Sequence, residues 1–136
     1  MSDARLSGAL APSLDDVAAL GEAALAGLPE PFRSRIGEVL VRVQDFADDD
    51  TLDALDIDDP YDLTGLFEGD SPLHRSVLDP VIGPRVVTLY RRPILDEWAA
   101  RGDVGLGALV TTVVVHEIGH HFGLSDDDID RIEAGA

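Results

Sequence analysis

The stretch from Val104 to Asp126 constrains the fold of this chain more than any other. No charged side chain occurs from Val104 to Val115, and this run leads directly into His116-Glu117-Ile118-Gly119-His120. A helix that is apolar nearly all round is typical of one buried against a sheet. The stretch therefore predicts a buried helix from about Leu106 to Phe122 that carries its polar residues at one end.

The spacing of the polar residues indicates a metal site. His116 and His120 are four residues apart, so on a helix they project from one face and can share a metal ion. Glu117 lies one position round the helix, where its carboxylate can take a proton from a metal-bound water. This pattern favours two metal ligands and a general base over two ordinary histidines at a helix end.

The glycines and the last histidine of the motif have separate predicted roles. Gly119 in mid-helix costs about 1 kcal/mol, which predicts the close approach of another backbone or side chain. Gly123 is typical of a left-handed helix stop that turns the chain back toward the metal. His121 points about 100° away from His120, so we expect it to pack or to support the site through a hydrogen bond.

A third ligand is needed, because three protein ligands and a water make an open catalytic zinc site. Asp126 lies where the chain turns back after Gly123, and it is the predicted third ligand. The same residue also suits the start of a last helix, where an acid complements the helix dipole. The alternative third ligands are Asp127, Asp128 and Glu133.

Charge and composition exclude several classes of function. A net charge of −17 argues against binding to nucleic acid or to anionic membranes. The absence of cysteine leaves imidazole and carboxylate as the metal ligands. The chain has no visible secretory signal and no apolar stretch long enough to span a membrane, so we expect a cytoplasmic location. The acidic residues from Asp45 to Asp62 predict a solvated, poorly structured loop, and they lack the glycine that an EF-hand calcium loop requires.

Turn and cap signals divide the chain into an α+β arrangement, a small sheet with helices packed on it. We expect a flexible tail over residues 1–12 and a single domain over residues 13–136. The predicted strands are Val39–Phe46, Leu63–Glu68 and Arg85–Tyr90, with a loop or turn over residues 73–84. Four helices are predicted. The first follows Ser13, and the second begins near Pro93 and ends near Arg101. The third spans residues 106–122, and the fourth runs from Ser125 through Ile132.

The complete pattern, His-Glu-x-x-His-x-x-Gly-x-x-Asp over residues 116–126, resembles the extended motif of zincin metallopeptidases, with aspartate in place of the third histidine of metzincins. More specifically, the chain is similar to the small bacterial zincin-like metallopeptidases, or minimal zincins, formerly a domain of unknown function. The similarity also includes residues 65–69, 86–94 and 120–127. It implies a minimal zincin-like domain with a small mixed sheet beside the active-site helix. It also implies that His116, His120 and Asp126 hold Zn²⁺ and that Glu117 is the general base.

The chain departs from metzincins downstream of the motif. Metzincins have a methionine turn beneath the metal, whereas Met1 is the only methionine here and ten residues follow Asp126. We therefore expect no C-terminal subdomain to form the far wall of a substrate cleft.

The expected function is a zinc-dependent metallopeptidase that hydrolyses a peptide or protein substrate through a metal-activated water. The alternatives are a non-catalytic metal-binding interaction module and a metal-assisted hydrolase of a small amide. If the strand near Leu66 lies at the sheet edge, a peptide can add there as an extra strand. Tyr90, Arg91 and Arg92 are candidate substrate-orienting groups, although ion pairing is favoured for the arginines. The sequence does not define the oligomeric state.

Overall fold

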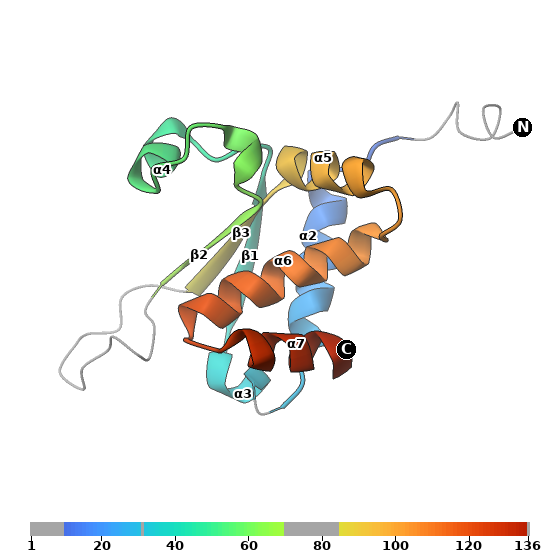
Figure 1. Cartoon of the computed structure of the whole chain (residues 1–136), viewed down its shortest axis with the longest axis vertical. Coiled ribbons are helices and arrows are strands. Elements are labelled where there is room, and N and C mark those ends of the chain that lie inside the picture. Colours follow the sequence, from blue (N-terminus) through green and yellow to red (C-terminus); the bar gives the residue numbers. More distant parts are fainter. Residues whose placement is uncertain (1–9, 31, 70–84, 136) are drawn as a thin grey trace, which may run out of the picture.

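A computed structural model describes residues 10–30, 32–69 and 85–135 of the chain, and they form the expected α+β fold (Figure 1). Within these residues the strands are β1 (Val39–Gln44), β2 (Gly65–Glu68) and β3 (Arg85–Tyr90). The helices are α2 (Leu14–Ala26), α3 (Phe32–Ile36), α4 (Asp49–Ala54), the short 3-10 helix η1 (Pro60–Asp62), α5 (Arg91–Arg101), α6 (Leu106–His121) and α7 (Asp126–Gly135).

The three strands form a mixed sheet in the order β1-β3-β2. β1 runs parallel to β3, with Val41 opposite Val87, and β2 runs antiparallel to β3, with Phe67 opposite the same residue. The short strand β2 is therefore an edge of the sheet, as its predicted role in adding a peptide strand requires.

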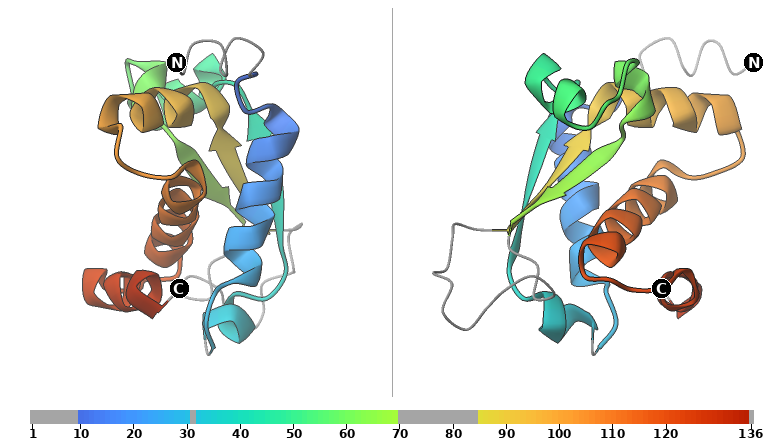
Figure 2. Two further views of the ribbon diagram at one scale, coloured as in Figure 1. Left: turned by 90° about the vertical axis from the view of Figure 1, so that its right-hand side faces the viewer. Right: turned by 60° about the vertical axis from the view of Figure 1, so that its left-hand side comes forward.

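One face of the sheet carries the main core, and helices α2 and α6 cover it together (Figure 2). The alternation along β1 places Val41 toward this face and leaves Leu40 exposed. α2 packs closely on the sheet at Gly21, where an added Cβ would lie 2.9 Å from the Leu89 side chain. Val110 and Val114 of α6 are fully buried behind the sheet, which explains the apolar run in the sequence.

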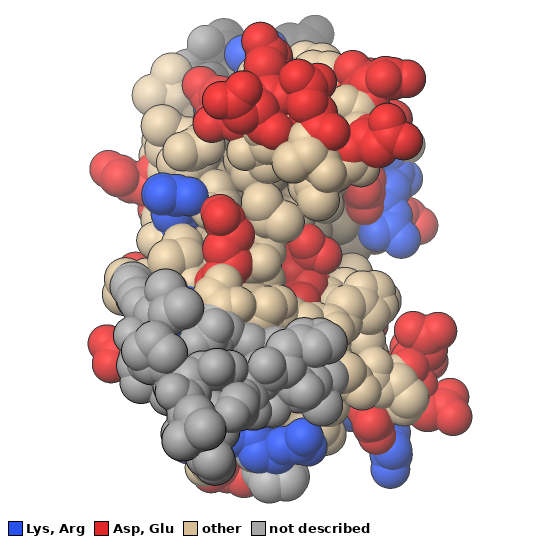
Figure 3. All heavy atoms as spheres, turned by 90° about the vertical axis from the view of Figure 1, so that its left-hand side faces the viewer, with Lys and Arg blue, Asp and Glu red and all other residues tan. Residues whose placement is uncertain are grey.

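The acidic segment is more ordered than predicted. Instead of a poorly structured loop, it forms α4 and η1, and Asp48 and Asp59 cap these helices by accepting hydrogen bonds from backbone N–H groups. Leu52 of α4 is buried in a second small core with Ala47 and Tyr90 on the other face of the sheet. The prediction counted the aspartates as solvated charges, and most are exposed, but two of them act as helix caps. Acidic side chains gather at this end of the molecule (Figure 3).

The other predicted elements differ from the structure mainly at their ends. The capping box of α2 is present, with Ser13 and Asp16 bonded to each other's backbone N–H groups. α5 begins at Arg91, two residues before Pro93, and α7 continues past Ile132 to Gly135. Helix α3 was not predicted, and the loop predicted over residues 73–84 lies outside the described residues. Among the described helices, none has the length and apolar character needed to cross a membrane.

Candidate metal centre

The end of α6 is shaped by the glycine that the sequence singled out. Gly123 has a φ of 73°, the left-handed conformation that favours glycine. The Leu124 N–H donates to the Gly119 carbonyl at 2.8 Å, and the Gly123 N–H donates to the His120 carbonyl at 3.2 Å. These two bonds form a Schellman motif, which ends the helix and turns the chain toward α7. The predicted helix stop is confirmed.

Gly119 allows α7 to lie directly against α6. A Cβ at this position would meet the Cγ1 and Cδ1 atoms of Ile129 at 2.8 Å, and Ile129 is fully buried. The predicted close approach is therefore a side chain of α7. Because α7 is held here, its carboxylates lie near the two histidines of the motif.

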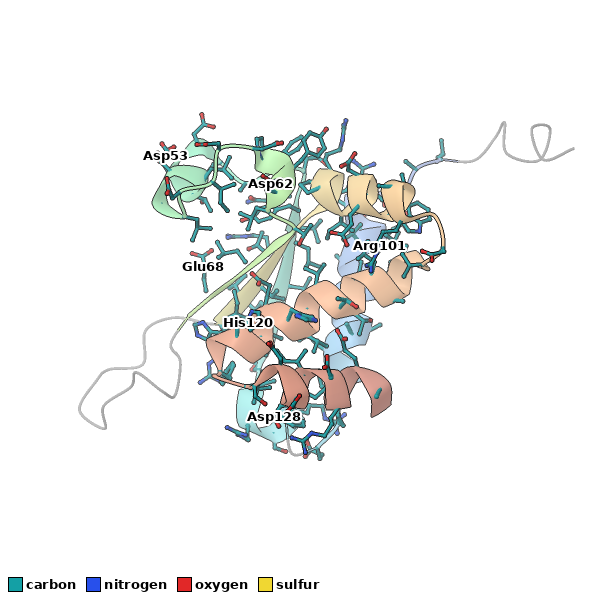
Figure 4. The ribbon with its side chains drawn as sticks, in the orientation of Figure 1. Asp53, Asp62, Glu68, Arg101, His120 and Asp128 are labelled. Atoms are coloured by element: carbon teal, nitrogen blue, oxygen red, sulfur yellow. The ribbon has the colours of Figure 1, made fainter. Side chains whose placement is uncertain are left out.

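His116 and His120 project from neighbouring turns of α6, as their spacing predicted. Their ring centroids are 5.9 Å apart and the rings are nearly perpendicular. The side chain of His116 is 41% exposed and that of His120 is 59% exposed. Figure 4 shows His120 in the last part of α6, above the helix α7 that carries Asp128. Both imidazoles are thus open to solvent from the same side of the helix.

Each histidine has a carboxylate of α7 beside it. Nε2 of His120 lies 3.9 Å from Oδ1 of Asp126, the predicted third ligand, whose side chain is 92% exposed. Nε2 of His116 lies 3.3 Å from Oε1 of Glu133. Within residues 10–30, 32–69 and 85–135, no three His, Asp or Glu side chains are placed closely enough to hold a metal ion together. The structure thus brings the expected ligands together in pairs, and a rotation of a carboxylate side chain is needed to complete a set of three.

Glu117 points to the sheet side of α6, toward the edge strand. A Cβ on Gly65 of β2 would lie 3.4 Å from Cγ of Glu117 and 2.8 Å from Cγ1 of Val113. Burial raises the pKa of the Glu117 carboxyl above its ordinary value, and His120 and His116 partly oppose the rise. A carboxylate with a raised pKa is a stronger base, as proton transfer near neutral pH requires.

His121 packs away from the other two histidines, as predicted. Its ring centroid is 4.4 Å from that of Phe67 on β2 and 5.5 Å from that of Phe122. Phe67 is buried in the main core. His121 therefore helps to fix the end of α6 against the edge strand.

The candidate substrate-orienting residues at the start of α5 make contacts with other parts of the fold. Arg91 forms an ion pair with Asp45 at 3.0 Å, and its Nε donates to the Pro12 carbonyl at 2.6 Å. Arg92 lies over the ring of Phe46. Tyr90 belongs to the small core beneath α4. The ion pair favoured for Arg91 is confirmed.

The types of donor at the end of α6 fit a divalent transition metal. Imidazole and carboxylate are zinc ligands, and the chain offers both on α6 and α7. Oε1 of Glu133 is buried and has no hydrogen bond among the described residues, so a cation beside His116 would satisfy it. Sequence reasoning missed Gly65, which permits the contact between β2 and Glu117. A glycine at a strand position is a general signal for such an approach.

Comparison with known proteins agrees with the fold and with the motif. The curated proteins include no match to this chain. Residues 36–136 match the sequence model of one family, described as zincin-like metallopeptidase. This match covers the whole sheet, α6 and α7, and so includes every residue of the candidate centre. The chain belongs to the zincin-like metallopeptidase family.

Proposed function

We propose that this protein is a metal-dependent peptidase that cleaves peptide bonds with water. The observation that carries the proposal is the position of Glu117, half-buried between α6 and the edge strand β2 and next to two solvent-accessible histidines. A base, two imidazole ligands and a strand edge for a substrate are the parts that such a reaction needs.

In this proposal His116, His120 and Asp126 hold Zn²⁺. When bound, the ion supplies an acidified water and polarises the carbonyl of the substrate. Asp126 lies beside His120, and its exposed side chain is free to rotate toward the ion. The Gly123 turn supports this role because it directs the chain from His120 back to α7.

Glu117 is the general base. Its carboxylate accepts a proton from the attacking water and then passes that proton to the amine that leaves the substrate. Burial favours the protonated form of Glu117 that the second step requires, because it raises the pKa of the carboxyl.

The substrate is proposed to bind along β2. Within the described part of the chain this strand pairs with β3 on one side only, so its other edge offers backbone N–H and C=O groups to an extended peptide. Gly65 lies at the start of β2 and in contact range of Glu117. A peptide added to this edge would therefore pass the catalytic carboxylate.

The test is the variant Glu117→Gln, which keeps the size of the side chain and removes the base. We expect the variant to bind zinc as tightly as the natural protein and to lose cleavage across a broad peptide library. Unchanged cleavage by the variant would contradict the proposed role of Glu117. If the natural protein binds one zinc per chain but cleaves neither peptides nor small amides, the non-catalytic binding module is the correct function. Cleavage of small amides alone would identify a small-amide hydrolase.

A further inference from the structure

We propose that Glu133, near the end of α7, is an additional carboxylate ligand of the metal ion, bound beside His116. This inference rests on the metal site of the proposed function and adds a protein donor to it. Helix α7 would then supply two carboxylates, that of Asp126 from its first turn and that of Glu133 from its last turns.

The first argument is distance. Oε1 of Glu133 lies 3.3 Å from Nε2 of His116. Two donors on one tetrahedral zinc ion, each at its usual bond length, are themselves about 3.3 Å apart. The corresponding separation between Asp126 and His120 is longer, at 3.9 Å. The His116–Glu133 pair therefore already has the spacing of two ligands.

The second argument is which nitrogen of His116 the carboxylate faces. A carboxylate that only supports a ligating histidine contacts the ring nitrogen that the metal leaves free. Nε2 is the outer nitrogen of the ring, and Nε2 of His120 likewise faces a carboxylate of α7. Glu133 faces Nε2 of His116, so its place is on the metal side of the ring.

The third argument is burial. The Glu133 side chain is 29% exposed, whereas that of Asp126 is 92% exposed. Oε1 of Glu133 is shielded from solvent and lacks a hydrogen bond among the described residues. Ile129 and Ile132, four residues and one residue before Glu133, anchor α7 in the main core. Glu133 is thus held in place, as a preorganised ligand should be.

A second carboxylate would change the chemistry of the ion. Together with Asp126 it would give two imidazole and two carboxylate donors, and a water would be the fifth donor. Catalytic zinc sites are usually four-coordinate and can expand to five donors. A mixed set of nitrogen and oxygen donors of this kind also suits iron and manganese. The two carboxylates would balance the double positive charge of the ion.

The experiment is a competition between the full-length protein and a chromophoric zinc chelator, which yields the zinc affinity without any assay of activity. Glu133→Gln removes the charge and keeps the size of the side chain. Glu133→Asp keeps the charge and withdraws the carboxylate by one methylene. Asp130→Asn, at an exposed position on the same helix, is the matched control for loss of one negative charge.

We expect both Glu133 variants to lose at least about 10-fold in zinc affinity, which is the lower end of the range for removal of a group that only supports a ligand. Asp130→Asn should bind as the natural protein does. The visible absorption spectrum of the Co²⁺-loaded protein should also change in Glu133→Gln, because it responds to the number and type of ligands.

The inference is overturned if Glu133→Gln binds zinc as tightly as the natural protein and leaves the Co²⁺ spectrum unchanged. It is also overturned if Glu133→Asp retains full affinity, since only the charge would then matter. These results would leave the proposed function intact. Failure of the natural protein itself to bind zinc would overturn the proposed function and this inference together.

Discussion

Gly119 is the residue on which the geometry of the candidate centre most directly depends. Alanine at this position would gain about 0.5–1 kcal/mol of helix stability over glycine. Its Cβ would, however, lie 2.8 Å from two carbons of the buried Ile129 side chain. Overpacking of this kind typically costs about 1–3 kcal/mol. We therefore expect Gly119→Ala to have a lower free energy of unfolding than the natural protein, as measured by urea denaturation.

Gly107 in the same helix is the matched control for Gly119. A Cβ at Gly107 would meet the Leu20 side chain at 3.5 Å, an ordinary contact, so Gly107→Ala should stabilise the protein. Ile129→Val removes one of the carbons in the Gly119 contact and should reduce the cost of Gly119→Ala. If the cost of Gly119→Ala is the same with valine at position 129, Ile129 is not the obstacle.

Because of Tyr90, we expect the stability of the folded protein to fall at alkaline pH. Burial, with a smaller contribution from Glu68, raises the pKa of its phenol. The folded protein then keeps a proton that the unfolded chain loses above the ordinary pKa of about 10, so stability falls as the pH rises from there through the raised pKa. The chain has no lysine and only two tyrosines, which isolates this effect.

The measurement is the free energy of unfolding in urea at two conditions, neutral pH and a pH above the ordinary tyrosine pKa. Tyr90→Phe should remove most of the loss of stability between the two conditions. Tyr61→Phe, at an exposed position, should retain the loss. An equal loss in Tyr90→Phe and in the natural protein would contradict the assignment to Tyr90.

Among the elements, β2 and α6 lie close together at Gly65. A Cβ there would lie 2.8 Å from Cγ1 of Val113 and would also touch Glu117. We expect Gly65→Ala to push the edge strand away from the helix and to destabilise the protein by about 1–3 kcal/mol. Urea denaturation measures the change. Gly105→Ala, where no atom of the described residues beyond its chain neighbours lies within 4 Å of the added Cβ, should have a much smaller effect.

Helix α6 and strand β3 could be predicted from the sequence because each depends on a local pattern. The apolar run, the histidine spacing and Gly123 define α6 to within one residue at its end, and β3 matches Arg85–Tyr90. Local pattern also predicted that another group would lie against Gly119. It did not identify that group as Ile129, because this contact depends on the packing of α7.

Helix α4 was missed because its stability comes from contacts that are distant in the sequence. Its sequence is dominated by aspartate, a poor helix former and a good helix cap. Leu52 is the side chain that holds α4 on the sheet, and its partner Tyr90 lies on β3. The pairing of His116 with Glu133 is equally non-local, so the sequence left Glu133 among several candidate ligands.

At the scale of the whole molecule, the acidic helices α4 and η1 and the acidic helix α7 lie on opposite sides of α6 (Figures 1 and 4). Helices α4 and η1 lie at the end of the sheet where β2 begins. The candidate ligands come from α6 and α7, and β2 contributes the edge beside Glu117. A bound ion would therefore link the C-terminal helix to the helix that crosses the main core.

That link predicts that zinc stabilises the folded chain. At a free zinc concentration of about 100 times the dissociation constant, the free energy of unfolding should rise by about 2.7 kcal/mol. For a chain of this size the Tm should rise by several degrees, measured by scanning calorimetry with and without zinc. His116→Ala should lose this rise because it removes a ligand. His121→Ala removes a histidine that packs against Phe67, so its Tm should fall in the absence of zinc, yet zinc should still raise it. An equal zinc-dependent rise in Tm in His116→Ala and in the natural protein would mean that the ion binds elsewhere. If only His121→Ala lost the rise in Tm, the ion would bind on the other side of α6.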